Sequence, residues 1–252
     1  IHACDLVAIA YQDKFFRDDP YYQARRKVAL LVGLDCLEPC EGGFCPTVDA
    51  GPFVRPGTAD LILQPPSQSG GTWLLLAVSE AGEKSLKGLS LRPGPADWRE
   101  KRAWQERNAV ARFASVPYIR EGIHKINQGQ VDPKTWESLG TQCFTCSGCT
   151  NLCPTCSCFA TKDQKTSPAS EDFERERCWD SCLFEGFQRE ASGHNPAVTP
   201  GQRVERYWYH KFSNDYLEEF GRYGCVGCGR CERTCIGIIG VHSVMKRLAE
   251  QP

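Results

Sequence analysis

Several features that would define an obvious class of protein are missing from the sequence. No apolar run approaches the roughly 18 residues that a membrane-spanning helix needs, so we expect no membrane span. The formal net charge is −1, so the chain as a whole does not attract nucleic acid or an anionic membrane electrostatically. We therefore expect no nucleic-acid partner. No G-x-G-x-x-G after a strand, no P-loop and no serine-nucleophile elbow occurs, so no catalytic or nucleotide site is predicted.

The sequence also lacks an initiator methionine, because it begins at Ile1, and it shows no signal-peptide pattern. We interpret it as starting inside a longer natural chain, with targeting information missing from its N-terminal side. Its 252 residues, 41% of them hydrophobic, are enough to bury a core in one large domain or in two ordinary ones.

Cysteine is absent from residues 46–142, although the chain has 16 cysteines. Four lie within residues 4–45, eight within 143–182 and four within 225–235. A disulfide scaffold is usually short and has little other core, whereas this chain is long and carries helix and strand patterns. We therefore favour metal binding over disulfides for the clustered cysteines.

Two short runs, "CFTCSGCTNLCP" at residues 143–154 and "CVGCGRCERTCI" at 225–236, share the spacing C-x2-C-x2-C-x3-C. A structural zinc ion usually takes two separated pairs of ligands. Three cysteines at intervals of three residues instead suit a loop that wraps around a metal cluster, which is larger than a single ion. The fourth cysteine of such a run normally ligates the other cluster of a two-cluster protein. The matched runs therefore predict two [4Fe–4S] clusters.

The runs are expected to exchange their last thiolates, which uses all eight cysteines and brings the clusters close enough for electron transfer. The predicted ligands of cluster I are Cys143, Cys146, Cys149 and Cys235. The predicted ligands of cluster II are Cys225, Cys228, Cys231 and Cys153. Pro154 follows the first run as the motif prefers, and we expect Ile236 to be tolerated after the second because proline is not a ligand.

The predicted fold class is α+β, with an N-terminal α/β domain at residues 1–128 and a helical ferredoxin-like two-cluster domain at 129–252. In the first domain, helices are expected after Asp5 and after the N-cap Asp19, with Pro20 at the first helical position. Apolar runs predict strands. They lie at residues 28–34, 59–64 and 72–79. A charged helix is expected between Pro95 and Val116.

Beyond a boundary near residues 121–130, the sequence is predicted to be helical. The expected helices lie at residues 132–140, 170–191, 213–221 and 240–250. The 71 residues between the two runs, 154–224, are far longer than the connection of a small bacterial ferredoxin. This length and the predicted helices favour a helical ferredoxin module of the kind built into larger oxidoreductase complexes.

Four further cysteines follow the first run. Two interpretations stay open for Cys156, Cys158 and Cys182: a further metal or redox-thiol site near the clusters, or small apolar side chains that pack the core. For Cys178, which would share a helical face with Cys182 in a helix over 170–191, we favour packing.

The four N-terminal cysteines form a separate group in an otherwise cysteine-free domain. These are Cys4, Cys36, Cys40 and Cys45. The glycines of "GLDCLEPCEGGFC" allow the backbone to curl around a cluster, so a third iron–sulfur cluster is one interpretation. Zinc and structural thiols are the alternatives, because the spacing matches no standard motif. His2 is a neighbouring candidate ligand, and His210 is expected to pack or form hydrogen bonds.

The motifs together carry a family resemblance. "CSGCTNLCPTCSCF", "RCWDSC", "GHNP", "RYWYHKF" and "CVGCGRCERTC" resemble the iron–sulfur β subunit of soluble multisubunit [NiFe] hydrogenases, and equally the A subunit of anaerobic sulfite reductase. "HACDLVAI", "DPYYQARR" and "GLDCLEPCEGGFC" extend the resemblance over nearly the whole chain. Two departures stand out: Gly43 where the family commonly has cysteine, and Pro196 where it commonly has arginine.

The resemblance implies a cytoplasmic, non-catalytic subunit that relays electrons. Its partners would be a flavin-containing NAD(P)H subunit and a catalytic subunit, either a [NiFe] hydrogenase or a sulfite reductase. The alternative from another class is a stand-alone iron–sulfur redox sensor, and a further alternative is an enzyme acting at an incompletely ligated N-terminal cluster.

Overall fold

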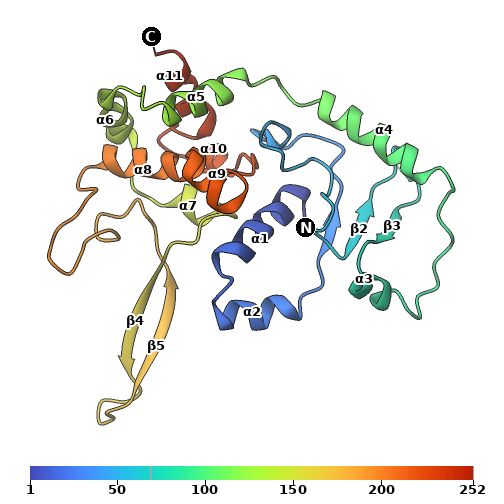
Figure 1. The fold of residues 1–252 in the computed structure, drawn as a ribbon, viewed down its shortest axis with the longest axis horizontal. Helices are drawn as coiled ribbons and strands as arrows, with labels where there is room; N and C mark the ends of the chain where they lie inside the picture. The colour runs from blue at the N-terminus through green and yellow to red at the C-terminus, as the bar shows by residue number, and fades with distance from the viewer. Residues whose placement is uncertain (69, 252) are drawn as a thin grey trace. The chain divides into compact units, whose positions relative to one another are not determined.

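A computed structural model describes residues 1–68 and 70–251, whose contacts form two compact units (Figure 1). The first unit comprises Ile1–Val116 and Tyr223–Gly229, and the second comprises Pro117–Arg222 and the residues from Arg230 onward. The fold is mixed α+β, with an N-terminal α/β region and a largely helical C-terminal part, as predicted. None of the helices in the described part of the chain combines the length and apolarity that crossing a membrane requires.

The first unit consists of helices around a small sheet. Its elements are α1 (Ala3–Phe15), α2 (Pro20–Lys27), β1 (Val32–Leu34), the 3-10 helix η1 (Cys45–Val48), β2 (Leu61–Gln64), β3 (Leu74–Ala77), α3 (Glu80–Ser85) and α4 (Trp98–Ala111). The predicted cap of α2 is confirmed, because the Asp19 carboxylate accepts a hydrogen bond from the backbone N–H of Tyr22 and Pro20 opens the helix.

The three-stranded sheet has the order β1-β2-β3, with β1 parallel and β3 antiparallel to β2. Strand β1 is shorter than the predicted strand at 28–34, because Val28 caps α2 and is 83% exposed. One core of this unit packs α1 against the sheet; its buried members are Ala3, Leu6, Leu31, Val54 and Ile62.

The second unit is mainly helical. Its elements are α5 (Pro117–Asn127), α6 (Pro133–Gln142), α7 (Gly148–Asn151), β4 (Phe159–Lys165), β5 (Phe173–Trp179), α8 (Pro200–Phe212), α9 (Asn214–Phe220), α10 (Arg230–Thr234) and α11 (Val241–Ala249). Helix α5 packs against α11, which places the division between the units before the boundary expected at residue 128. That expected domain boundary stays a prediction.

Glycines allow close helix contacts in this unit. A Cβ on Gly122 of α5 would lie 2.7 Å from the sulfur of Met245 on α11. A Cβ on Gly140 of α6 would lie 2.7 Å from the Cα of Gly201 on α8. Helix α8 was not predicted, although its capping box, in which Thr199 and Gln202 bond each other's backbone N–H groups, is visible in the sequence.

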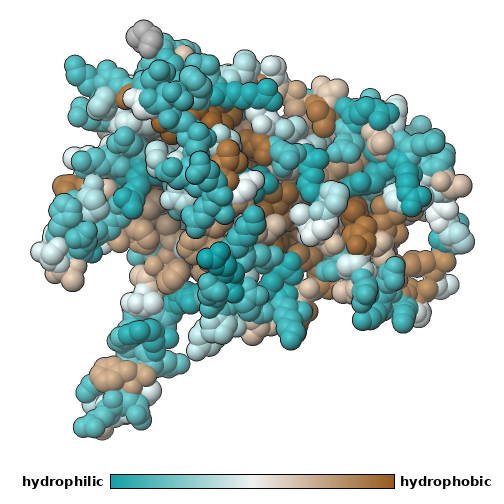
Figure 2. All heavy atoms as spheres, in the orientation of Figure 1, coloured by the Kyte–Doolittle hydropathy of each residue, from teal (hydrophilic) through white to brown (hydrophobic). Residues whose placement is uncertain are grey.

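The helix predicted over residues 170–191 is wrong. Residues 173–179 instead form β5, which pairs with β4 in an antiparallel hairpin that extends away from α7 and α8 (Figure 1). Residues of opposite charge face each other across the two strands. Lys162 lies opposite Glu176, and Arg175 donates to both oxygens of Asp163 at 2.6 and 2.7 Å. The hairpin is hydrophilic over most of the face drawn in Figure 2.

Candidate iron–sulfur centres

Both cysteine runs have the same unusual backbone conformation. In the first run, φ is 49° at Thr145 and 59° at Ser147. In the second run, φ is 63° at Gly227 and 71° at Gly229, at the same two positions after the first cysteine. Residues other than glycine adopt this left-handed region at a cost, and such strain is concentrated at functional sites. The two loops therefore curl in the same way around their cysteines.

A short helix follows each loop, α7 in the first run and α10 in the second, and the two helices pack together within the second unit. A Cβ on Gly148 of α7 would lie 3.3 Å from the Oγ1 of Thr234 on α10. This contact brings Cys235, the residue after α10, toward Cys149 in α7.

The four thiols predicted for cluster I meet at one cavity. It is lined by Cys143, Cys146, Cys149 and Cys235. The rest of its wall is mostly apolar and comes from Phe144, Leu183, Val204, Tyr207, Trp208, Ile236 and Ile239. The space between these atoms amounts to about 470 Å³, part of it open to solvent. Four sulfur donors on a mostly apolar wall fit an iron–sulfur cluster, which cysteine thiolates hold.

Burial and the charges of the neighbouring thiolates make Cys143 and Cys149 hard to ionise without a cation. Burial, followed by the charges of Cys143, Cys235 and Cys146, raises the pKa of Cys149 to about 12. Burial also raises the pKa of Cys143. The backbone N–H of Ile239 donates to the sulfur of Cys235 at 3.4 Å, a type of hydrogen bond that tunes cluster potentials. A bound cluster would supply the positive charge that the four thiolates need.

The thiols predicted for cluster II are divided between the two units. Cys225 and Cys228 belong to the first unit, where the N–H of Gly227 donates to the sulfur of Cys225 at 3.4 Å. Cys231 and Cys153 belong to the second unit. The complete ligand set of cluster II stays a prediction, because its four cysteines belong to two different units.

Lys211 was missed as a site residue by the sequence analysis, although "HKF" marked its position. Its ammonium group is buried, at 3% exposure, and donates to the hydroxyl of Thr155 at 3.1 Å. The same hydroxyl lies 3.1 Å from the sulfur of Cys153. A hydrogen bond from Cys156, followed by the charge of Lys211, holds the pKa of Cys153 well below its usual range despite burial. The lysine thus favours the thiolate form that a ligand requires.

Cys156, Cys158 and Cys182 lie in the same part of the second unit. A hydrogen bond from the Cys182 side chain lowers the pKa of Cys158 to about 6, with a smaller contribution from Lys211. The same hydrogen bond, together with burial, raises the pKa of the Cys182 thiol. Cys178 is on β5, opposite Ala160, so the predicted helical face shared with Cys182 does not exist.

The four N-terminal cysteines also meet at one cavity, within the first unit. Cys4, Cys36, Cys40 and Cys45 line it together with Cys228. Burial raises the pKa of Cys36 to about 11 and that of Cys45 to about 12. The Nδ1 atom of His2 lies 3.3 Å from the sulfur of Cys36 and also faces this cavity.

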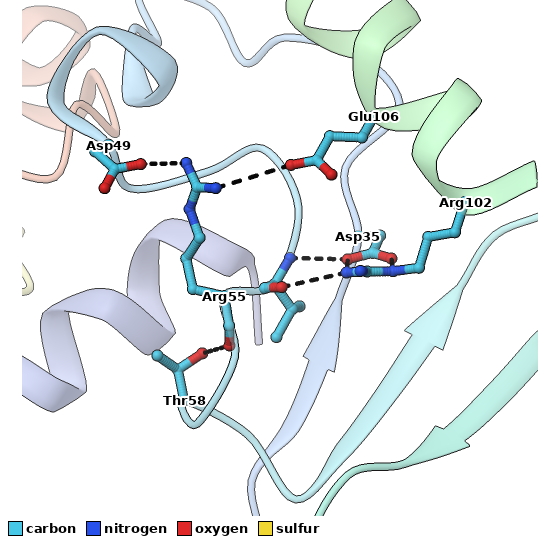
Figure 3. A network of polar contacts seen from close by, with 7 residues as sticks. Asp35, Asp49, Arg55, Thr58, Arg102 and Glu106 are labelled. Carbon is cyan, nitrogen blue, oxygen red and sulfur yellow. Dashed lines mark hydrogen bonds and ion pairs between the residues drawn. The ribbon is translucent and has the colours of Figure 1, made fainter. Parts of the chain in front are cut away.

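A buried polar network holds the loop that carries Cys36 (Figure 3). The carboxylate of Asp35, 1% exposed, accepts two hydrogen bonds from Arg102 of α4 at 2.7 and 2.8 Å and one from the N–H of Val54 at 2.8 Å. Arg55 in turn pairs with Asp49, which follows η1. A charge-assisted bidentate pair is among the stronger hydrogen-bonded contacts, so it fixes the residue that precedes Cys36.

No group of three or more His, Cys, Asp or Glu side chains within residues 1–68 and 70–251 is arranged to hold a single metal ion. A zinc ion draws four sulfurs in to about 2.3 Å from one centre. A cubane instead takes one thiolate at each of four separate iron atoms.

Comparison with known proteins identifies a cluster-binding family in the same part of the chain. Residues 142–239 match the family described as a 4Fe-4S dicluster domain. The fold and the thiol sites thus define a dicluster iron–sulfur protein, with two [4Fe–4S] clusters and a role in electron transfer.

The chain is also similar to sulfhydrogenase 2 subunit beta of Pyrococcus furiosus, with 30% identity over 241 residues that cover 93% of this chain and 68% of the relative. It belongs to this family of iron–sulfur β subunits. No solved structure matches the chain.

Proposed function

We propose that the chain is the electron-relay subunit of a hydrogenase complex, between a flavin-containing NAD(P)H subunit and a catalytic [NiFe] subunit. The observation that carries this proposal is the pair of matching loops, whose backbone conformation repeats at Thr145 and Ser147 and at Gly227 and Gly229. Two such loops serve two clusters, and two clusters in series suit a relay between other redox sites. The name of the similar Pyrococcus furiosus protein, a sulfhydrogenase subunit, supports a hydrogenase partner.

The proposed ligands are those of the exchange between the runs. Cluster I takes Cys143, Cys146, Cys149 and Cys235, and cluster II takes Cys225, Cys228, Cys231 and Cys153. The cavity shared by the first four thiols supports the exchange, because Cys235 comes from the second run.

The residues of this chain would hold and tune the clusters rather than act on a substrate. When bound, [4Fe–4S] clusters supply one-electron transfer. The apolar wall that includes Val204 and Trp208 would limit the contact of cluster I with water. The N–H of Ile239 donates to the sulfur of Cys235, and the buried charge of Lys211 favours the thiolate form of Cys153.

Anaerobic purification of the affinity-tagged chain from its own cells tests the proposal. We expect it to bring along a flavin-containing subunit and a nickel-containing subunit, and we expect hydrogen gas to bleach the visible absorption of the clusters in the complex. The matched Cys149→Ser complex should transfer electrons from hydrogen to NAD(P)+ at a greatly reduced rate, whereas Cys178→Ser should behave as the unmodified complex.

Other outcomes would overturn the hydrogenase assignment. Isolation of the chain alone, with clusters that bleach on oxidation, would indicate a redox sensor. Electron exchange with sulfite but not with hydrogen would indicate the relay of a sulfite reductase.

A further inference from the structure

We propose that the first unit binds a third iron–sulfur cluster through Cys4, Cys36, Cys40 and Cys45, beside Cys228 of the second cysteine run. These four cysteines lie outside residues 142–239, the part of the chain that matches the dicluster domain. The inference rests on the proposed function only for the role of Cys228 as a cluster II ligand.

The four thiols reach one cavity from helix α1, from the loop after β1 and from the start of η1. Cys4 is in the first turn of α1, Cys36 follows β1, Cys40 lies in the loop after it and Cys45 opens η1. Cys4 and Cys45 are buried, at 9% and 8% exposure, whereas Cys40 is exposed. Thiols that only filled a core would close the space between them. These thiols instead border a hollow of about 320 Å³, part of it open to solvent.

The backbone around the cavity is shaped to leave room at the sulfurs. Gly42 has a φ of 66°, and the N–H of Gly43 closes a turn on the carbonyl of Cys40 at 2.9 Å. A Cβ on Gly51 would lie 3.1 Å from the sulfur of Cys45, so glycine keeps that sulfur uncrowded. The Asp35–Arg102 pair of Figure 3 fixes the residue before Cys36. The loop is thus held in a curl around its cysteines.

The loop of the second run lies directly on this cysteine loop. The N–H of Phe44 donates to the carbonyl of Gly227 at 2.7 Å. A Cβ on Gly227 would lie 2.6 Å from the backbone nitrogen of Cys45, so the two backbones touch. This contact places Cys228 at the cavity wall. Cys228, the proposed ligand of cluster II, would therefore also border a cluster held by the four N-terminal thiols and would connect the two electronically.

The donor set suits an iron–sulfur cluster. A cubane takes one thiolate at each of its four irons, and four thiols line this one cavity. The exposed position of Cys40 also suits a cluster near the surface, where a partner can exchange electrons with it.

An anaerobic iron and sulfide count of the full chain tests this inference. We expect about twelve irons per chain, from three cubanes of four irons each, rather than about eight. Cys36→Ser and Cys40→Ser should each lose about four irons and one reduced-state EPR signal. Both positions avoid the buried core, unlike Cys4, so the variants should fold. Cys178→Ser, on the exposed hairpin, is the matched control and should keep all the iron.

The count also separates this inference from the proposed function. If Cys149→Ser loses iron while Cys36→Ser and Cys40→Ser lose none, the third cluster is absent and the dicluster stands. If the N-terminal variants lose iron and Cys149→Ser does not, the third cluster stands and the dicluster assignment fails. About one zinc per chain that disappears in Cys36→Ser would likewise overturn the third cluster.

Discussion

The two cysteine runs have the same spacing and the same backbone signs, yet they achieve this conformation with different residues. The first run places Thr145 and Ser147 at positive φ, whereas the second places Gly227 and Gly229 there. The spacing fixes which sulfurs face a cluster, and the neighbours of each loop decide which residue types can form it.

The neighbours differ on the outer side of each loop. In the first run, the hydroxyl of Ser147 accepts a hydrogen bond from the side chain of Asn151 at 3.0 Å and donates to the carbonyl of Cys146 at 2.7 Å. In the second run, the backbone of Phe44 and Cys45 occupies the space where a Cβ of Gly227 would lie. The first loop is therefore stabilised by its own side chains, and the second by a packing contact that excludes any side chain.

The largest effect is expected from removing one thiolate ligand from a cysteine run. Cys149→Ser removes a thiolate from the cluster I cavity, so we expect the loss of about four irons while the cluster of the second run remains. Iron and sulfide analysis, with EPR of the reduced protein, measures this loss. Cys178→Ser is the control, and equal iron in both variants would contradict the assignment of cluster I.

Gly227→Ala breaks the packing contact of the second run. Its Cβ would lie 2.6 Å from the nitrogen of Cys45, and φ at this position is 63°. We expect the free energy of unfolding of the first unit to fall by about 3 kcal/mol. Unfolding by denaturant under anaerobic conditions, monitored by hydrogen exchange at residues of the first unit, measures this free energy. A decrease below about 0.5 kcal/mol would show that the contact is not tight.

Lys211→Met sharpens the comparison through electrostatics, because the lysine affects Cys153 of the first run, the predicted ligand of cluster II. Removing a buried positive charge disfavours the reduced, more negative cluster. We expect the reduction potential of cluster II to fall by roughly tens of millivolts and that of cluster I to change less.

Redox titration monitored by EPR follows both potentials in Lys211→Met. Lys211→Arg keeps the charge, so the potential of cluster II in this variant should stay close to that of the unmodified protein. A shift of equal size in both variants would indicate a packing effect instead.

The smallest expected effect concerns strain in the first run. Thr145→Gly removes a β-branched residue from φ of 49°, at a position where the second run already has glycine. We expect the free energy of unfolding to change by no more than about 1 kcal/mol, because relief of strain offsets the greater freedom of glycine in the unfolded chain. A loss as large as that of Gly227→Ala would contradict the equivalence of the two loops.

The sequence predicted the elements whose signals are local. The spacing of the runs identified the cluster family, and Asp19 and Asp132 marked the starts of α2 and α6 correctly. Contacts between distant segments were not predictable in the same way. "FERERCW" alternates charge, and its meaning as a strand depends on the partner segment "FATKDQK". The helix expected over residues 170–191 was therefore wrong over this segment.

The candidate sites show the same limit. The eight predicted cluster ligands follow from spacing alone, but the position of Cys228 beside the N-terminal thiols depends on a long-range contact between Phe44 and Gly227. The buried environment of Lys211 likewise arises only when α8 packs near Thr155. Neither contact leaves a signal in the local sequence.

Reduced-state EPR of three single variants, Cys149→Ser, Cys235→Ser and Cys231→Ser, tests the exchange of ligands between the runs most directly. The account predicts that Cys149→Ser and Cys235→Ser alter the same cluster signal, because both thiols line one cavity, and that Cys231→Ser alters the other. Alteration of one signal by both Cys231→Ser and Cys235→Ser, with the Cys149→Ser signal separate, would contradict it.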